Sequence, residues 1–174
     1  MAVHTFYSML CGGRISAVEK PRAVADLVLG DPELLPELAA LIDCEEPLVR
    51  SRAAYALKEI AASQPGLLQA FKPALIDRLA APDDSHISRY CMLESLRCLV
   101  LSDEDVSLLL DMLKDFMHSD SSIVKALTLQ MLAEFMNTDE SLRAEIIPLL
   151  WEALNNGTPA MRARARKLLK QYKL

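Results

Sequence analysis

Four positions that could recognise a ligand recur at nearly the same step along the chain. Tyr55, Glu94, Gln130 and Lys167 follow one another at intervals of 39, 36 and 37 residues. Each lies opposite the apolar stripe of an expected helix, so the four should share one polar face, which is either an ordinary solvated face or a binding surface. Tyrosine and arginine are favoured anchors at protein interfaces, and we therefore predict contacts to a protein or peptide. The candidate partner-binding residues are Tyr55, Lys58, Tyr90, Glu94, Arg97, Gln130, Lys167 and Lys170.

Residue patterns for bond-making chemistry are missing from the sequence. It contains no Gly-x-Ser-x-Gly, no glycine-rich phosphate loop and no His-Glu-x-x-His. The carboxylates Asp103 and Asp105 precede or begin an expected helix, where they complement the helix dipole. His86 and His118 fall in successive turns, and elements packed about 10 Å apart would barely let such side chains converge on a metal. We expect no catalytic residue, no metal and no cofactor.

The four cysteines and the apolar content bear on the compartment. Cys91 and Cys98 stand seven residues apart on an expected helix, about two turns, which is too far for a disulfide. Reduced thiols are typical of an intracellular protein. The first residues lack the basic leader of a signal peptide, and no apolar run reaches the roughly 18 residues of a membrane span. We predict a cytoplasmic protein with no membrane contact.

The charge is distributed unevenly. The chain has a net charge of −5, yet residues 1–161 hold 13 Lys and Arg against 24 Asp and Glu. Such an acidic balance disfavours binding to polyanions. The basic residues after Met161 either complement the C-terminal dipole of a last helix or contact an acidic protein or a nucleic acid. They are Arg162, Arg164, Arg166, Lys167, Lys170 and Lys173.

An internal repeat of about 37 residues indicates which elements must position the candidate residues. Each unit carries a leucine-rich first segment, a polar turn and a second helical segment. The leucines Leu38, Leu75, Leu113 and Leu150 mark the first segments, and Leu57, Leu96, Leu132 and Leu169 mark the second. Pro36, Pro73 and Pro148 stand two residues before three of the first leucines. We predict that each proline lies inside a helix and kinks it.

The repeat predicts an all-α fold, an αα superhelix of about four and a half helix pairs in a single domain, 1–174. A partial unit covers 1–32, with its second helix at 20–30 and a break at Gly12-Gly13. Ser85 and Thr158 should cap the helices that follow them, and Pro47 should open another. Stacked pairs would share one continuous core. The complete units are expected at about 33–65, 66–102, 103–138 and 139–174.

The residues of the first complete unit resemble the HEAT-repeat family, a group of armadillo-like α-solenoids. Its pattern is a leucine-rich helix with a proline, an Asp-containing turn, and Val-Arg opening a second helix of small residues. Residues 34–43 and 47–57 match this pattern, with Val49-Arg50 at the Val-Arg step. Met161-Arg162 echoes that step, whereas Asp111 replaces the proline of its unit. The resemblance covers about 16–174 and implies a superhelix whose second helices line its concave side.

The resemblance also implies a range of functions, because one fold hosts many. We predict a non-enzymatic scaffold or adaptor that binds a protein or peptide along the second helices, as a monomer or weak homo-oligomer. The alternative is a nucleic-acid-binding protein of the DNA alkylation-repair type that uses the basic C-terminal helix. Some HEAT-like proteins are DNA glycosylases or bilin lyases. The acidic balance and the aromatic content of 5% place those activities below a scaffold.

Overall fold

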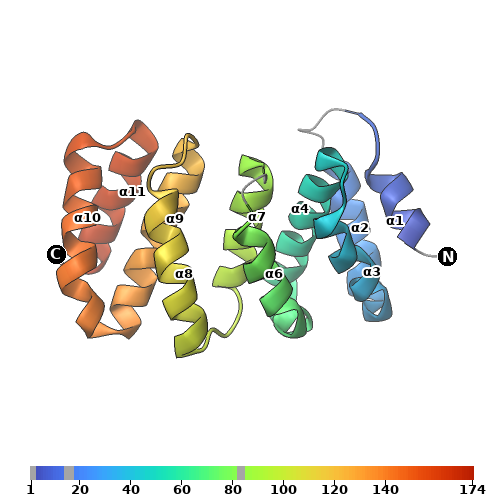
Figure 1. Cartoon of the computed structure of the whole chain (residues 1–174), viewed down its shortest axis with the longest axis horizontal. Coiled ribbons are helices and arrows are strands. Elements are labelled where there is room, and N and C mark those ends of the chain that lie inside the picture. The colour runs from blue at the N-terminus through green and yellow to red at the C-terminus, as the bar shows by residue number, and fades with distance from the viewer. Residues whose placement is uncertain (1–2, 14–17, 82–84) are drawn as a thin grey trace. The chain divides into compact units, whose positions relative to one another are not determined.

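The computed structural model describes residues 3–13, 18–81 and 85–174, and every regular element in these ranges is a helix. The chain divides into two compact units, Met1–Val100 and Leu101–Leu174. The helices of the first unit are α1 (Val3–Leu10), α2 (Glu19–Gly30), α3 (Leu35–Ala40), α4 (Pro47–Ser63), α5 (Pro65–Leu68), α6 (Lys72–Leu79) and α7 (His86–Arg97) (Figure 1). Those of the second are α8 (Asp103–Phe116), α9 (Ser122–Thr138), α10 (Arg143–Asn156) and α11 (Pro159–Gln171). The all-helical class is confirmed, and the superhelical stacking and single repeat domain stay predictions.

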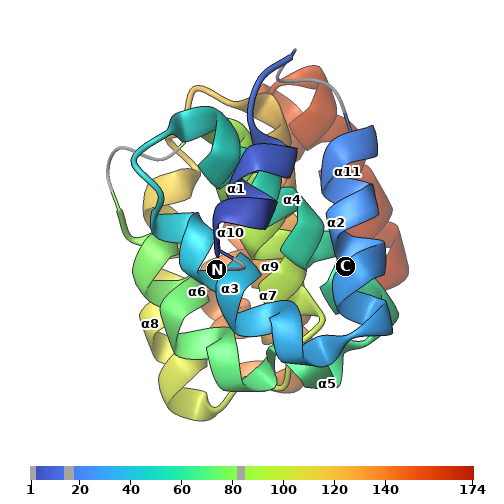
Figure 2. The same ribbon diagram turned by 90° about the vertical axis from the view of Figure 1, so that its right-hand side faces the viewer.

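In the first unit, α4 packs between α2 and α7, while α3 contacts α4 and α6 contacts α7. The end-on view separates α2 from α3 and α6, which lie on the other side of this unit (Figure 2). The stripe Val49, Ala53, Leu57 and Ile60 is fully buried in α4, as its helical spacing predicts. Burial of this stripe fixes the rotation of α4 and so determines which side chains reach its polar face.

In the second unit, α9 packs on α8, α10 and α11. In the middle of α9, every residue from Ala126 to Ala133 is buried, so other elements cover nearly all sides of the helix. Helix α8 begins with a capping box in which Ser102 accepts a hydrogen bond from the Asp105 amide and Asp105 accepts one from the Ser102 amide. Lys114 of α8 reaches Glu145 of α10 at 2.7 Å. This ion pair links α8 to α10, and both of these helices pack on α9.

The three prolines of the repeat occupy two different kinds of position. Pro148 lies inside α10, as predicted. The prediction is wrong for Pro36 and Pro73, which lie in the first turns of α3 and α6. A short 3-10 segment precedes each helix, Pro32–Leu34 before α3 and Gln69–Phe71 before α6. Proline in a first turn removes no intrahelical hydrogen bond, so these two prolines start helices instead of kinking them.

The predicted caps and breaks are confirmed. Ser85 accepts a hydrogen bond from the Ser88 amide, and Thr158 accepts one from the Met161 amide. Gly12 and Gly13 adopt positive φ angles of 66° and 79°, which glycine tolerates better than other residues. Among the described residues, no helix combines the length and apolar character needed to cross a bilayer.

A buried arginine of α4 holds the end of α1. Arg52 is only 2% exposed. Its Nη1 donates hydrogen bonds to the carbonyl oxygens of Leu10 at 2.5 Å and Gly12 at 2.6 Å. Lys20 of α2 donates to the carbonyls of Cys11 and Gly12. These cationic donors satisfy carbonyls that the end of a short helix leaves without partners, and they dock α1 onto α2 and α4.

Candidate partner-binding ridge

Five of the eight predicted binding residues lie on two adjacent helices of the first unit. Tyr55 and Lys58 belong to α4, and Tyr90, Glu94 and Arg97 belong to α7, which packs along α4. All five are partly exposed. We call this group the ridge, and it is made of Tyr55, Lys58, Tyr90, Glu94 and Arg97.

The α4 part of the ridge is built around Lys58. The Lys58 ammonium lies 2.7 Å from Glu59 Oε1 and 4.1 Å from the centroid of the Tyr55 ring, which is a cation–π distance. Arg22 of α2 approaches the same carboxylate, with Nε 3.7 Å from Oε2. Glu59 therefore lies between two cations, and the ring of Tyr55 covers one of them.

These neighbours shift the pKa values of both members of the pair. Burial lowers the pKa of Lys58, but the hydrogen bond and negative charge of Glu59 outweigh it, so the pKa is raised overall. Burial raises the pKa of Glu59, but hydrogen bonding to Lys58 and the charges of Lys58 and Arg22 lower it overall. Both shifts favour the charged forms. The pair is ionised at neutral pH.

The α7 part of the ridge has a second ion pair. Arg97 Nη1 lies 2.7 Å from Glu94 Oε2, one helical turn away. Burial raises the pKa of the Tyr90 phenol, and the negative charge of Glu94 raises it further, while Lys58 acts in the opposite direction. Tyr90 therefore lies within the electrostatic reach of groups on both helices. Its hydroxyl stays protonated at neutral pH and is hydrogen-bonded to Glu94.

The three remaining predicted residues lie in the second unit and differ in exposure. Lys167 and Lys170 of α11 are exposed, whereas Gln130 of α9 is 8% exposed. The Gln130 amide is held from both sides: its Nε2 donates to Glu134 Oε1 at 2.7 Å, and its Oε1 accepts from Arg164 Nη1 at 2.7 Å. Gln130 thus links α9 to α11 and orients Arg164.

Sequence reasoning missed the acidic partners of these residues. Glu59 and Glu134 were not candidates, yet each neutralises or orients a predicted residue. Both stand four residues after a ladder position, Tyr55 or Gln130, and residues four apart face each other on a helix. That spacing was the signal that could have identified them.

Two other polar groups of α4 serve packing. The hydroxyl of Ser51, which is 1% exposed, lies 2.8 Å from that of Ser85 and 3.1 Å from that of Ser88. This cluster joins α4 to the first turn of α7. Arg50 Nη1 donates to the Cys44 carbonyl at 2.7 Å, so the arginine of the Val-Arg step braces the turn before its own helix.

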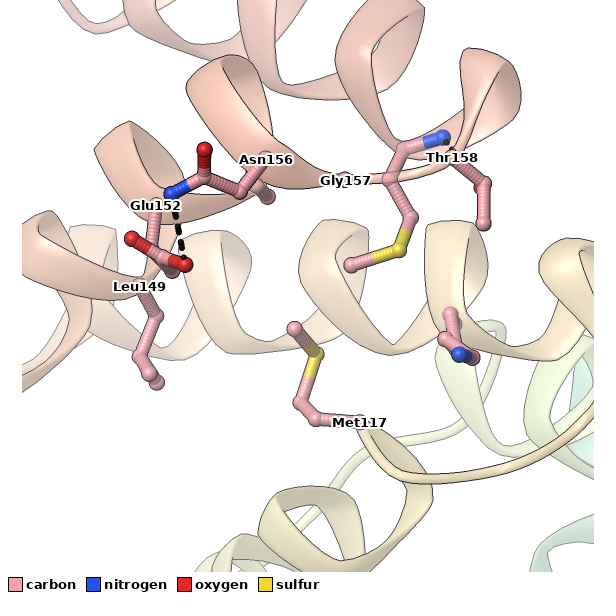
Figure 3. A pocket seen from close by; sticks show the side chains of 9 residues that line it. Met117, Leu149, Glu152, Asn156, Gly157 and Thr158 are labelled. Carbon is pink, nitrogen blue, oxygen red and sulfur yellow. Dashed lines mark hydrogen bonds between the residues drawn. The ribbon is translucent and has the colours of Figure 1, made fainter.

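A recess of about 200 Å³ opens in the second unit between the end of α8 and the α10–α11 turn (Figure 3). Met117 and Met161 supply thioether surface, and Glu152 at its edge accepts a hydrogen bond from Asn156 at 2.9 Å. Flexible methionines adapt to varied apolar shapes. The lining of the recess also includes Lys125 and Thr158, so its surface is partly apolar and partly polar.

Chemistry-bearing groups are otherwise dispersed over the described ranges. Within the part of the chain that the structure describes, Cys11, Cys44, Cys91 and Cys98 are not joined by disulfides. No cluster of three or more His, Cys, Asp or Glu side chains arranged to hold a metal ion occurs in residues 3–13, 18–81 and 85–174.

In comparisons with known proteins, no family model and no curated protein matches the chain.

Proposed function

We propose that this protein is a non-enzymatic, HEAT-like solenoid scaffold that binds a protein or peptide along its second helices, with the ridge as the principal contact. The proposal rests on one observation. The five ridge residues, predicted from repeat spacing, belong to two packed helices, and each helix contributes a tyrosine and an ion pair to the ridge.

The chemistry of the ridge favours a peptide over a small charged ligand. Its two tyrosines offer amphipathic surface with little conformational freedom to lose. Its charges are already paired, Lys58 with Glu59 and Arg97 with Glu94. Paired charges leave no strong net field for an isolated ion, but they present donors and acceptors to the amides and side chains of a peptide.

The charge of the whole chain also favours a protein partner over nucleic acid. Before Arg162 the acidic residues outnumber the basic ones by 24 to 13. Nucleic-acid binding draws most of its affinity from neutralised phosphates, and an acidic surface works against it.

A peptide-display selection tests the proposal even though the partner is unidentified. Peptides selected on the wild-type chain are synthesised, and their dissociation constants are measured by fluorescence anisotropy. Tyr90→Ala and Arg97→Gln should weaken binding, Tyr90→Ala by about 30-fold if it is an anchor contributing about 2 kcal/mol. Tyr7→Ala is the matched control, because Tyr7 is an exposed tyrosine on α1, outside the ridge. Equal losses for Tyr7→Ala and Tyr90→Ala, or no loss for Tyr90→Ala, would contradict the proposal.

A further inference from the structure

Helix α11 presents a row of cations to solvent. Arg162, Arg166 and Lys170 recur every four residues on one face, and all three are exposed. Lys167 lies beside them and Lys173 just beyond the helix end, both exposed. Among the described residues, no carboxylate forms an ion pair with any of these five cations. We call the row Arg162, Arg166 and Lys170 the basic stripe.

The core of the second unit fixes the direction of the basic stripe. Met161, Ala165, Leu168 and Leu169 are buried on the other face of α11, which packs on α9 and α10. A rotation of α11 that hid the cations would expose these apolar side chains. The stripe is therefore held outward by hydrophobic packing.

Helix α8 of the same unit presents the opposite charge. Glu104, Leu108, Asp111 and Asp115 lie on one exposed face at steps of four, three and four residues. Leu108 is 51% exposed, and the Asp111 side chain is 88% exposed. Lys114 lies 3.7 Å from Asp111, but its closer partner is Glu145 at 2.7 Å. We call the row Glu104, Leu108, Asp111 and Asp115 the acidic stripe.

The two stripes carry opposite charges over comparable lengths. At 1.5 Å per residue, the basic stripe extends about 12 Å and the acidic stripe about 16 Å. The cations of the basic stripe are four residues apart, whereas the carboxylates of the acidic stripe are seven and then four residues apart, with Leu108 between the first two. A crossing of two helices at a small angle could therefore bring two neighbouring cations opposite Asp111 and Asp115. Each stripe points away from the core that holds its helix, and the alkyl stem of an arginine could cover the exposed Leu108.

The composition of α11 argues against a single-stranded nucleic acid or a lipid surface as the partner. Apart from its cations, the exposed residues of α11 are Pro159, Ala163 and Gln171. None is an aromatic residue that could stack on a base or a bulky apolar residue that could enter a lipid surface. An acidic helix requires neither.

We propose that the basic stripe of α11 binds the acidic stripe of α8 in a second copy of this chain. The two surfaces differ, so the contact is heterologous and each added copy still offers one free stripe of each sign. Two helix faces bury less than the roughly 800 Å² per partner of a standard interface. The association is therefore weak, depends on concentration and is screened by salt.

Sedimentation velocity over a concentration series tests this contact. Association of the wild type should be clear at about 0.01 M salt, where the Debye length is about 30 Å, and lost at about 1 M, where it is about 3 Å. Arg166→Glu with Lys170→Glu, or Asp111→Lys with Asp115→Lys, should raise the dissociation constant at least roughly tenfold, because like charges then face each other. Circular dichroism checks that each variant is folded. Asp26→Lys with Asp77→Lys makes the same charge change at exposed positions of the first unit and should leave association unchanged.

A charge swap separates pairing of these two stripes from a general charge effect. An equimolar mixture of the two double variants should associate again, and so should one chain that carries all four substitutions. The proposal is overturned if the wild type stays monomeric at low salt, or if neither the mixture nor the fourfold variant regains association. A monomeric wild type that binds a DNA duplex or anionic vesicles, and loses this on Arg166→Glu with Lys170→Glu, would reassign the stripe to that partner. Peptide binding at the ridge is a separate measurement, so the two proposals can fail independently.

Discussion

Replacing Arg52 by methionine should release α1 from the rest of the first unit. Methionine keeps an unbranched stem but removes the guanidinium that donates to the carbonyls of Leu10 and Gly12. Leu10 is fully buried, whereas Gly12 is exposed and its carbonyl can be rehydrated. A buried acceptor left without its donor costs about 1–3 kcal/mol. We expect a loss of about 2 kcal/mol, concentrated in the docking of α1.

Hydrogen exchange read by mass spectrometry measures this loss where it occurs. Because local opening governs exchange in a peripheral helix, 2 kcal/mol corresponds to about 30-fold faster exchange at the end of α1, with little change in α9. Arg166→Met is the matched control, since it makes the same chemical change at an exposed position of α11. The reasoning is refuted if α1 exchanges at the wild-type rate in the Arg52→Met variant, or if Arg166→Met accelerates it equally.

Two further perturbations test packing and electrostatics. Gly157→Ala should destabilise the second unit by about 1–3 kcal/mol in urea titrations. The new Cβ would collide with the Ala153 carbonyl oxygen and lie 2.8 Å from the Met161 Cβ. Gly30→Ala is the control and should not lower stability, because nothing lies within 4 Å of its added Cβ. Glu59→Gln should lower stability by at most about 1 kcal/mol at pH 7, since the pair with Lys58 is partly exposed. The pKa of Glu59 is lowered on folding, so this contribution is present above the unfolded value of about 4.3 and is lost as the pH falls through the folded value. Thermal melts from pH 7 to pH 3 should therefore converge for wild type and variant, and a constant difference would contradict this assignment.

The sequence by itself determined the helical class and the local signals of the chain. Apolar residues at helical spacing predicted the buried stripe of α4, and Ser85 and Thr158 predicted the helix starts that follow them. These features depend on residues within about one turn of each other, so a single segment carries enough information. The spacing of the second helices also assigned five predicted binding residues to α4 and α7, two helices that pack together, and their binding role stays a prediction.

Only the tertiary structure decided the roles that depend on neighbours distant in the chain. Gln130 reads as a surface residue of its helix, but Arg164 of α11 covers it and uses its amide. Arg52 belongs to no site predicted from the sequence, yet the end of α1, about 40 residues earlier, buries it and accepts its hydrogen bonds. Pro36 and Pro73 read as interior kinks, but 3-10 segments place both in first turns. The physical reason is common to these cases: helical periodicity determines which residues share a face, whereas burial, partners and helix starts depend on which other segment packs against that face.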